Sequence, residues 1–120
     1  MKIKALAIAA IVALASTTAA YAGGNVSITS QKGTGNMAAT GQMGTGNFSG
    51  TGQVGKGNSS LSVQSGYKNV SGTAQFGKGN VSITDQAGKY NASGTMQFGR
   101  DNQSLTQQSG NGNQSLTVQH

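Results

Sequence analysis

The sequence predicts an all-β protein, a β-solenoid of nine 11-residue strand-turn units that form about four and a half two-strand coils of 22 residues. Three observations carry this prediction. An 11-residue repeat runs without a slip from Asn25 to the C-terminus. Its recurrent polar residues stand two positions apart, which is the side-chain period of a β-strand. Alternate units also differ from each other, as two strands within one coil would.

The repeated unit has the form N-x-S-x-T-x-Q-x-G-x-G. Ser follows each Asn by two residues, except at Ala38, and Thr follows by four, except at Ser62. A strand of about seven residues is therefore expected to end at a Gly-rich turn, because Gly adopts the positive φ that tight turns need. A helix is excluded, since this much Gly costs about 1 kcal/mol each against Ala and no 3.6-residue apolar stripe compensates. The predicted turn residues are Gly33, Gly44, Gly55, Gly66, Gly77, Gly88, Gly99 and Gly110.

The recurrent amides are the candidate self-assembly residues. Stacked coils, about 4.8 Å apart, would place each Asn over an Asn and each Gln over a Gln. Amide side chains in such columns can hydrogen-bond along the stack, as they do in cross-β structures. The predicted Asn columns contain Asn25, Asn36, Asn47, Asn58, Asn69, Asn80, Asn91, Asn102 and Asn113. The predicted Gln columns contain Gln31, Gln42, Gln53, Gln64, Gln75, Gln86, Gln97, Gln108 and Gln119.

Alternate units place their bulky residues differently. Three residues after Asn, the third, fifth and seventh units have a Gly, whereas the fourth, sixth and eighth have a large aliphatic residue: Gly50, Gly72 and Gly94 against Leu61, Ile83 and Leu105. The residue after Gln inverts the pattern: Val54, Phe76 and Phe98 against Ser65, Ala87 and Ser109. Two alternating strand types predict two sheets. The terminal units break this alternation.

The residues between the recurrent ones are, on average, the more apolar set, and Ile28, Val63 and Ile83 belong to it. Hydrophobicity alone would turn this set inward. We nevertheless expect the Asn, Ser, Thr and Gln side chains inside. Identity from layer to layer is required of stacked interior columns but not of solvated ones, and small Ser and Thr residues would let the two sheets approach closely.

The N-terminal segment has the pattern of a secretory signal peptide. Met1-Lys2-Ile3-Lys4 is basic, the stretch 5–15 is apolar, and Ala20-Tyr21-Ala22 matches an A-x-A cleavage site before Gly23. The alternative is a membrane anchor, but the apolar run is too short for a bilayer core of about 30 Å. We therefore expect residues 1–22 to be a cleaved signal peptide, residues 23–120 to be the secreted repeat domain, and no stable membrane insertion.

Composition argues against an enzyme. The only acidic residues are Asp85 and Asp101, and the only histidine is His120. Acid–base and nucleophilic catalysis need a positioned base or a second carboxylate. The chain also has no Cys, so neither disulfides nor a cysteine-based metal site can support it. No cofactor is expected.

Three cations are predicted to form a basic edge. Lys56, Lys78 and Arg100 lie 22 residues apart, so they should stack along one edge of the solenoid. Tyr67 and Lys89 should lie on the opposite edge. The basic edge either is solvated and keeps the monomer soluble, or holds extracellular DNA or an acidic polysaccharide through salt-dependent electrostatic attraction.

The units resemble the curlin repeats of curli-type functional amyloid in bacteria. The resemblance rests on Q-x-G-x-G-N followed six residues later by Gln, as in 31–36 with Gln42 and in 75–80 with Gln86, and it covers residues 23–120. It implies inward-facing Gln and Asn columns, secretion through an outer-membrane pore, assembly on a nucleator subunit, and a role in biofilm matrix, adhesion and cell aggregation. Asn replaces the Ser that leads alternate strands in that family.

The expected function is that of a structural subunit of an extracellular fibre on the cell surface, a pilus or fimbria. Ordering each residue of a 22-residue coil costs roughly 1–2 kcal/mol, whereas each hydrogen bond returns only about 1 kcal/mol. A lone coil should therefore be unstable, whereas a coil added to an existing one should be stable. This predicts slow nucleation followed by templated growth. The alternative is a monomeric β-solenoid that binds a surface, either ice or, as an adhesin, a polysaccharide.

Overall fold

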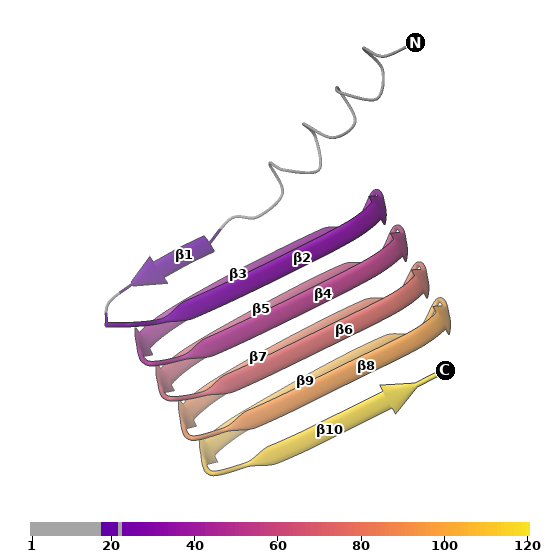
Figure 1. Ribbon diagram of the computed structural model, residues 1–120. Coiled ribbons are helices and arrows are strands. Elements are labelled where there is room, and N and C mark those ends of the chain that lie inside the picture. Colours follow the sequence, from indigo (N-terminus) through magenta and orange to yellow (C-terminus); the bar gives the residue numbers. More distant parts are fainter. Residues whose placement is uncertain (1–17, 22) are drawn as a thin grey trace, which may run out of the picture.

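The computed structural model describes residues 18–21 and 23–120, so most of the predicted signal peptide lies outside the described residues. All regular elements of the described part are strands (Figure 1). They are β1 (Thr18–Tyr21), β2 (Val26–Thr34), β3 (Met37–Thr45), β4 (Phe48–Lys56), β5 (Ser59–Tyr67), β6 (Val70–Lys78), β7 (Val81–Lys89), β8 (Ala92–Arg100), β9 (Gln103–Asn111) and β10 (Gln114–Gln119).

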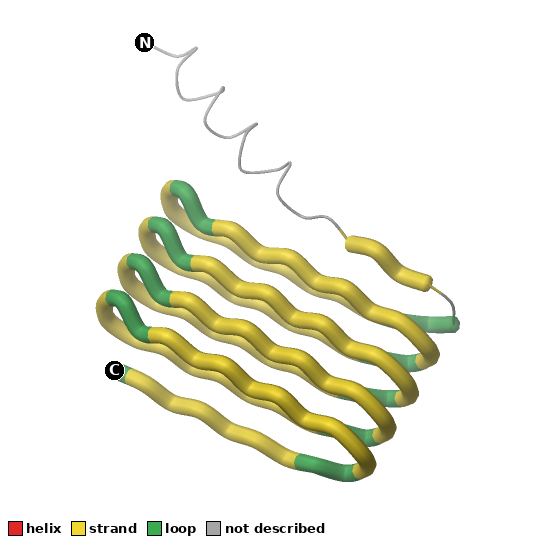
Figure 2. Tube along the Cα trace, turned by 180° about the vertical axis from the view of Figure 1, so that it is seen from behind, coloured by secondary structure: helices red, strands yellow, loops and turns green. Residues whose placement is uncertain are grey.

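The strands form two five-stranded sheets in which neighbouring strands run parallel. Consecutive strands along the chain alternate between the two sheets. One sheet has the order β1-β3-β5-β7-β9 and the other β10-β8-β6-β4-β2. Each residue from β2 onward pairs with the residue 22 positions along, as Gln53 pairs with Gln75. The chain thus winds as a flat coil with turns along both narrow edges (Figure 2). The predicted β-solenoid, with one strand per 11-residue unit in β2–β10, is confirmed.

The strands are longer than expected and the turns correspondingly shorter. Full-length strands have nine residues rather than about seven, beginning one residue after Asn. The glycines predicted in the turns lie inside the strands, next to the last residue, at φ of 99° to 128°: Gly33, Gly44, Gly55, Gly66, Gly77, Gly88, Gly99 and Gly110. Their positive φ bends the strand toward the edge while pairing continues, and the next two residues make the reversal.

The interior is polar, as predicted. Apart from Ala38, the buried residues in the described part are Asn, Ser, Thr and Gln. Gln64 and Asn69 have no exposed surface. The apolar side chains lie on the outer faces, where Ile28 remains 57% exposed. Sheet register, and not the hydrophobic content of a face, decides which face turns inward.

Strand β1 was not foreseen from the repeat. It belongs to the segment predicted to be a signal peptide, and it pairs with β3 so that Thr18 matches Thr40 and Ala20 matches Gln42. The side-chain hydrogen bonds of the coils run between Asn25 and Gln119.

Candidate assembly interface: amide columns and coil ends

Two columns of glutamines run through the solenoid. In one, the Nε2 of Gln31 donates to the Oε1 of Gln53, and the chain continues through Gln75 and Gln97 to Gln119 at 2.7–2.8 Å. The second column, in β3, β5, β7 and β9, joins Gln42, Gln64, Gln86 and Gln108 in the same way at 2.7–2.8 Å. Every bond points from the N-terminal toward the C-terminal coil, so each column has an acceptor end and a donor end.

The glutamines also tie the two sheets together. The second Nε2 hydrogen of Gln53 goes to the backbone carbonyl of Met37 in the opposite sheet, at 2.8 Å. Gln75 reaches Ser59 in the same way at 2.9 Å. One side chain thus bonds along the stack and across it, so both hydrogens of its amide nitrogen have acceptors.

The asparagines stack as predicted but do not bond amide to amide. The backbone N–H of Asn58 donates to the Oδ1 of Asn36 at 3.1 Å. The Nδ2 of Asn58 donates to the carbonyls of Val54 at 3.3 Å and of Gly77, in the next coil, at 3.2 Å. Asn is one methylene shorter than Gln and stands beside the turn, so backbone groups lie within its reach. Each Asn therefore closes a turn as well as joining two coils.

The strand-end glycines are required by close backbone approach as well as by φ. Gly66 has φ 120°, and a Cβ built there would overlap the carbonyl oxygen of Gly88 in the next coil. That same carbonyl accepts the side-chain amide of Asn69 at 3.2 Å. The position of these glycines before each reversal indicates the positive φ, but nothing in the repeat indicates this contact between coils, which any side chain would block.

The hydroxyl columns between the amides are less completely bonded. Thr40 and Ser49 approach to 3.5 Å between the sheets. Eight buried hydroxyls have no hydrogen-bond partner within the protein: Ser27, Ser60, Ser62, Ser71, Ser82, Thr84, Ser93 and Thr95. Stacking in register therefore pairs the amides described above but leaves these hydroxyls without a hydrogen bond. Their common property is small size, which lets the sheets approach.

The predicted basic edge is present as a column. Lys56 pairs in register with Lys78, and Lys78 with Arg100, at the ends of β4, β6 and β8. Thr34 begins this column in β2. All four side chains are exposed. The three cations are free to meet solvent or a polyanion.

An aromatic cluster on the opposite edge was only partly anticipated. Tyr67 and Tyr90 make an edge-to-face contact with ring centroids 5.6 Å apart, and the Lys68 ammonium lies 5.0 Å from the Tyr67 centroid. A hydrogen bond to Tyr67 and the attraction of both phenols raise the pKa of Lys68 above its ordinary value. Lys68 and Tyr90 have φ of 52° and 57°, at a position where most other units have Gly and one has Asp101, also at φ 57°. The sequence indicates this difference, because Lys68 and Tyr90 replace the Gly that is usual at the last position of the 11-residue unit.

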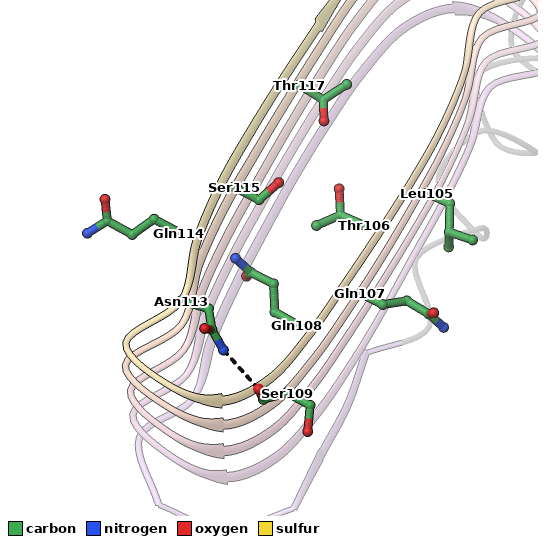
Figure 3. A pocket seen from close by; sticks show the side chains of 9 residues that line it. All are labelled: Leu105, Thr106, Gln107, Gln108, Ser109, Asn113, Gln114, Ser115 and Thr117. Atoms are coloured by element: carbon green, nitrogen blue, oxygen red, sulfur yellow. Dashed lines mark hydrogen bonds between the residues drawn. The ribbon is translucent and has the colours of Figure 1, made fainter.

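The C-terminal coil leaves the interior open (Figure 3). A hollow of about 470 Å³ lies between β9 and β10. Thr106, Gln108, Ser115 and Thr117 point into it, while Leu105, Gln107 and Gln114 point away. Asn113 donates to the carbonyl of Ser109 at 2.9 Å. β9 and β10 each have a strand neighbour on one side only, so this end displays the interior columns in cross-section.

No protein-family model matches the sequence, and no curated protein matches it either. Within the described residues, no three His, Cys, Asp or Glu side chains gather to hold a metal ion. The same part of the chain has no helix that is long and apolar enough to cross a membrane. The candidate site is therefore defined by the geometry of the amide columns and the coil ends.

Proposed function

We propose that the chain is the structural subunit of an extracellular curli-type amyloid fibre that grows by templated stacking of coils. The observation that carries this proposal is the one-way hydrogen bonding of the glutamine columns, from the acceptor ends at β2 and β3 to the donor ends at β9 and β10. The donor end of one copy and the acceptor end of another have the same spacing and opposite hydrogen-bonding character. Stacking two copies would continue each column.

The burial of the end coils supports growth at the ends. Gln64, Gln75 and Gln86 in the middle of the solenoid are fully buried, whereas Gln31 and Gln119 in the outermost strands are only half-buried. A buried polar group without a partner costs about 1–3 kcal/mol. A further copy would give the end amides the partners that the middle amides already have, so addition to an end is favoured over isolation.

The end strands also lack the features that block edge-to-edge pairing. Globular β proteins protect exposed edges with Pro, inward charges or covering segments. The chain has no Pro, and the inward residues of β9 and β10 are uncharged, like those of the other coils. These edges are suited to pairing with another chain.

The hydroxyl columns distinguish this function from surface binding by a monomer. A regular ice-binding surface built from Ser-x-Thr would need those hydroxyls on an outer face. Ser82 is 1% exposed and Thr84 is not exposed. The Ser-x-Thr array therefore faces the interior and supports stacking. A monomeric polysaccharide-binding adhesin remains the second candidate, favoured only by the exposed basic edge of Lys56, Lys78 and Arg100.

The resemblance to curlin repeats extends the proposal to the setting of the fibre. It supports export after removal of residues 1–22, passage through an outer-membrane pore, nucleation by a minor subunit, and a fibre that serves biofilm matrix and adhesion. The basic edge of each copy would then be exposed at the fibre surface, where it could hold extracellular DNA or acidic polysaccharide, with an affinity that falls steeply as salt is added.

A matched pair of variants tests the proposal on the polypeptide of residues 23–120. Gln108→Glu keeps the acceptor for Gln86 but removes the amide donor at the open end, whereas Gln107→Glu adds the same charge on the outer face. We expect wild-type protein to form seeded fibrils by thioflavin T fluorescence and electron microscopy. Gln108→Glu should slow elongation at least about tenfold, because a buried charge and a lost donor cost more than 1.4 kcal/mol.

Gln107→Glu should elongate within about twofold of wild type, because its side chain is solvated. A wild-type polypeptide that stays monomeric at every concentration, with or without seeds, would contradict the proposed function. Equal slowing by the two variants would show that charge, and not the interior column, governs growth.

A further inference from the structure

We propose that successive copies of the polypeptide of residues 23–120 join in the fibre with their two sheets exchanged, so that β9 of one copy pairs with β2 of the next, and β10 with β3. This inference rests on the proposed function and on removal of residues 1–22. Each copy would then be turned by half a coil, about 180°, relative to its neighbour. The two outer faces of the fibre would alternate from copy to copy.

The odd number of strands in β2–β10 favours the exchange. Consecutive strands alternate between the two sheets, and β2–β10 are nine strands. The place that follows β10 along the solenoid therefore lies beside β9, in the opposite sheet. The first strand of the next copy, β2, is the one that fills it. Stacking without exchange would put β2 beside β10 and leave the place beside β9 without a full strand.

The exchanged junction continues both interior columns. Gln108 would donate to Gln31 of the next copy, and Gln119 to Gln42 of the next copy, as the glutamines do inside one copy. The Oδ1 of Asn113 would accept from the backbone N–H of Asn36 of the next copy, as Asn36 itself does from Asn58. No amide in either column would be skipped.

The outer residues of β9 also support pairing with β2 of the next copy. The pentapeptide N-V-S-I-T occurs twice in the chain, at 25–29 and at 80–84. The second occurrence leads into β7, which pairs with β9 and places Ile83 beside Leu105. The exchanged junction places the first occurrence, in β2, on the other side of β9. Leu105 would then lie between Ile83 and Ile28 of the next copy, and each of these isoleucines belongs to the same pentapeptide sequence.

The outer face of β10 fits β3 in a comparable way. Leu116 covers Gly94 in β8, since a Cβ built on Gly94 would lie 3.2 Å from the Leu116 Cδ1. Exchange places Ala39 of β3 on the free side of Leu116, another small residue. Stacking without exchange would set Leu116 against Ile28 instead.

The junction also explains why the terminal units break the alternation of the sequence. Ile28 in β2 is followed in its own sheet by Gly50, and Ala39 in β3 by Leu61. Each strand thus differs from the sheet in which it lies. In the exchanged fibre, Ile28 would join the sheet that has Ile83 and Leu105 at this position, and Ala39 the sheet that has Gly72 and Gly94. The first two units therefore agree in side-chain size with the sheets that exchange would place them in.

Strand β1 occupies one of the edges that this junction needs. It pairs with β3 on the side where β10 of another copy would lie, and it places Ala20 at the Gln position. A copy that kept β1 would interrupt the glutamine column at that point. Removal of residues 1–22 exposes the edge of β3 and leaves an odd number of strands.

Engineered cysteine pairs test the exchange, because the chain has no Cys of its own. Ser30, Gln107 and Val118 occupy equivalent exposed positions in β2, β9 and β10. Exchange would place Gln107 beside Ser30 of the next copy, whereas stacking without exchange would place Val118 there. Neighbouring parallel strands lie about 4.8 Å apart, within the Cα separation that a disulfide spans.

Filaments of two double variants of residues 23–120, Ser30→Cys/Gln107→Cys and Ser30→Cys/Val118→Cys, would be assembled under reducing conditions and then oxidised. They would be dissolved in formic acid and run on non-reducing gels. We expect covalent multimers from the first variant, at least tenfold more than from the second. Asp85→Cys/Gln107→Cys is the matched control, because these positions are register partners within one copy and should give a closed monomer.

Multimers mainly from the second variant, similar amounts from both, or none from either while the control closes, would each overturn the exchange. Wild-type filaments give an independent measurement by helical reconstruction from cryo-electron microscopy. Exchange predicts an axial rise of about 22 Å per copy with a half-turn, against about 24 Å without one, from the 4.8 Å spacing. Absence of wild-type filaments before any oxidation would instead count against the proposed function.

Discussion

The inner and outer surfaces of the same strands follow different rules. On the inner surface, every coil repeats nearly the same Asn, Ser, Thr and Gln residues, and Gln64 is fully buried. On the outer surface the residues vary and are often apolar, yet its neighbour Val63 is 39% exposed. The surface with the greater hydrophobicity is thus the one left in solvent. Hydrogen bonds that depend on register, and not apolar burial, specify this fold.

The reason is the selectivity of the two kinds of contact. Apolar burial depends on area and is nearly indifferent to which apolar residue lies in the adjacent layer. A glutamine column works only if the layers above and below also present Gln at the same position. A slip of one residue would turn every inward side chain outward, so only pairings offset by whole repeat units keep the columns.

The largest effect in this comparison is expected at the strand-end glycines of the inner surface. Gly66→Ala should destabilise the coil by more than about 4 kcal/mol, because the new methyl group meets the Gly88 carbonyl and the residue keeps a positive φ. The control is Gly41→Ala on the outer face, where nothing lies within 4 Å of the added Cβ and φ is ordinary. The measurement is the guanidinium chloride midpoint of β-structure by circular dichroism. Similar midpoints for the two variants would refute the role of close approach.

A swap between adjacent inner and outer positions should have the next largest effect. Gln64→Val removes the bonds with Gln42 and Gln86 and leaves their amides unsatisfied, for an expected loss of about 2–6 kcal/mol. Val63→Gln places the same amide on the outer face and should cost less than about 1 kcal/mol. Denaturation midpoints compare the two. A smaller loss for Gln64→Val than for Val63→Gln would reverse the interpretation.

The sequence alone predicts those parts of the structure that follow from identical residues at the same position of every repeat. The period, the two sheets and the inward Gln all follow from the 11-residue spacing. The bonding of Asn58 to backbone carbonyls was not predictable, because it depends on the path of the turn beside it. The overlap at Gly66 depends on the distance between two coils, which no pattern within one strand contains. β1 carries no amide at the column position, so the repeat could not reveal it.

A moderate kinetic effect is expected from the charge on the outer face. Asp85 lies in register between Val63 and Gln107. Asp85→Val should shorten the thioflavin T lag about twofold, because it removes a charge that interrupts a β-prone run. Asp101→Asn is the charge-matched control, since Asp101 stands in a turn at φ 57° that Asn also tolerates. An equal shortening by Asp101→Asn would assign the effect to net charge. An unchanged or longer lag for Asp85→Val would contradict it.

The smallest effect is expected inside, at a polar residue that is deeply buried. Ser82 is 1% exposed, and its hydroxyl has no partner within the protein. Ser82→Ala should change the free energy of unfolding, measured by guanidinium chloride denaturation, by less than about 0.5 kcal/mol, because no hydrogen bond is lost and a desolvated hydroxyl is removed. Ala38 already occupies the equivalent position of β3 and is 4% exposed. Ser49→Ala, which loses the contact with Thr40, should cost slightly more. A loss above about 2 kcal/mol at Ser82 would mean that the hydroxyl columns, like the amide columns, hold the layers in register.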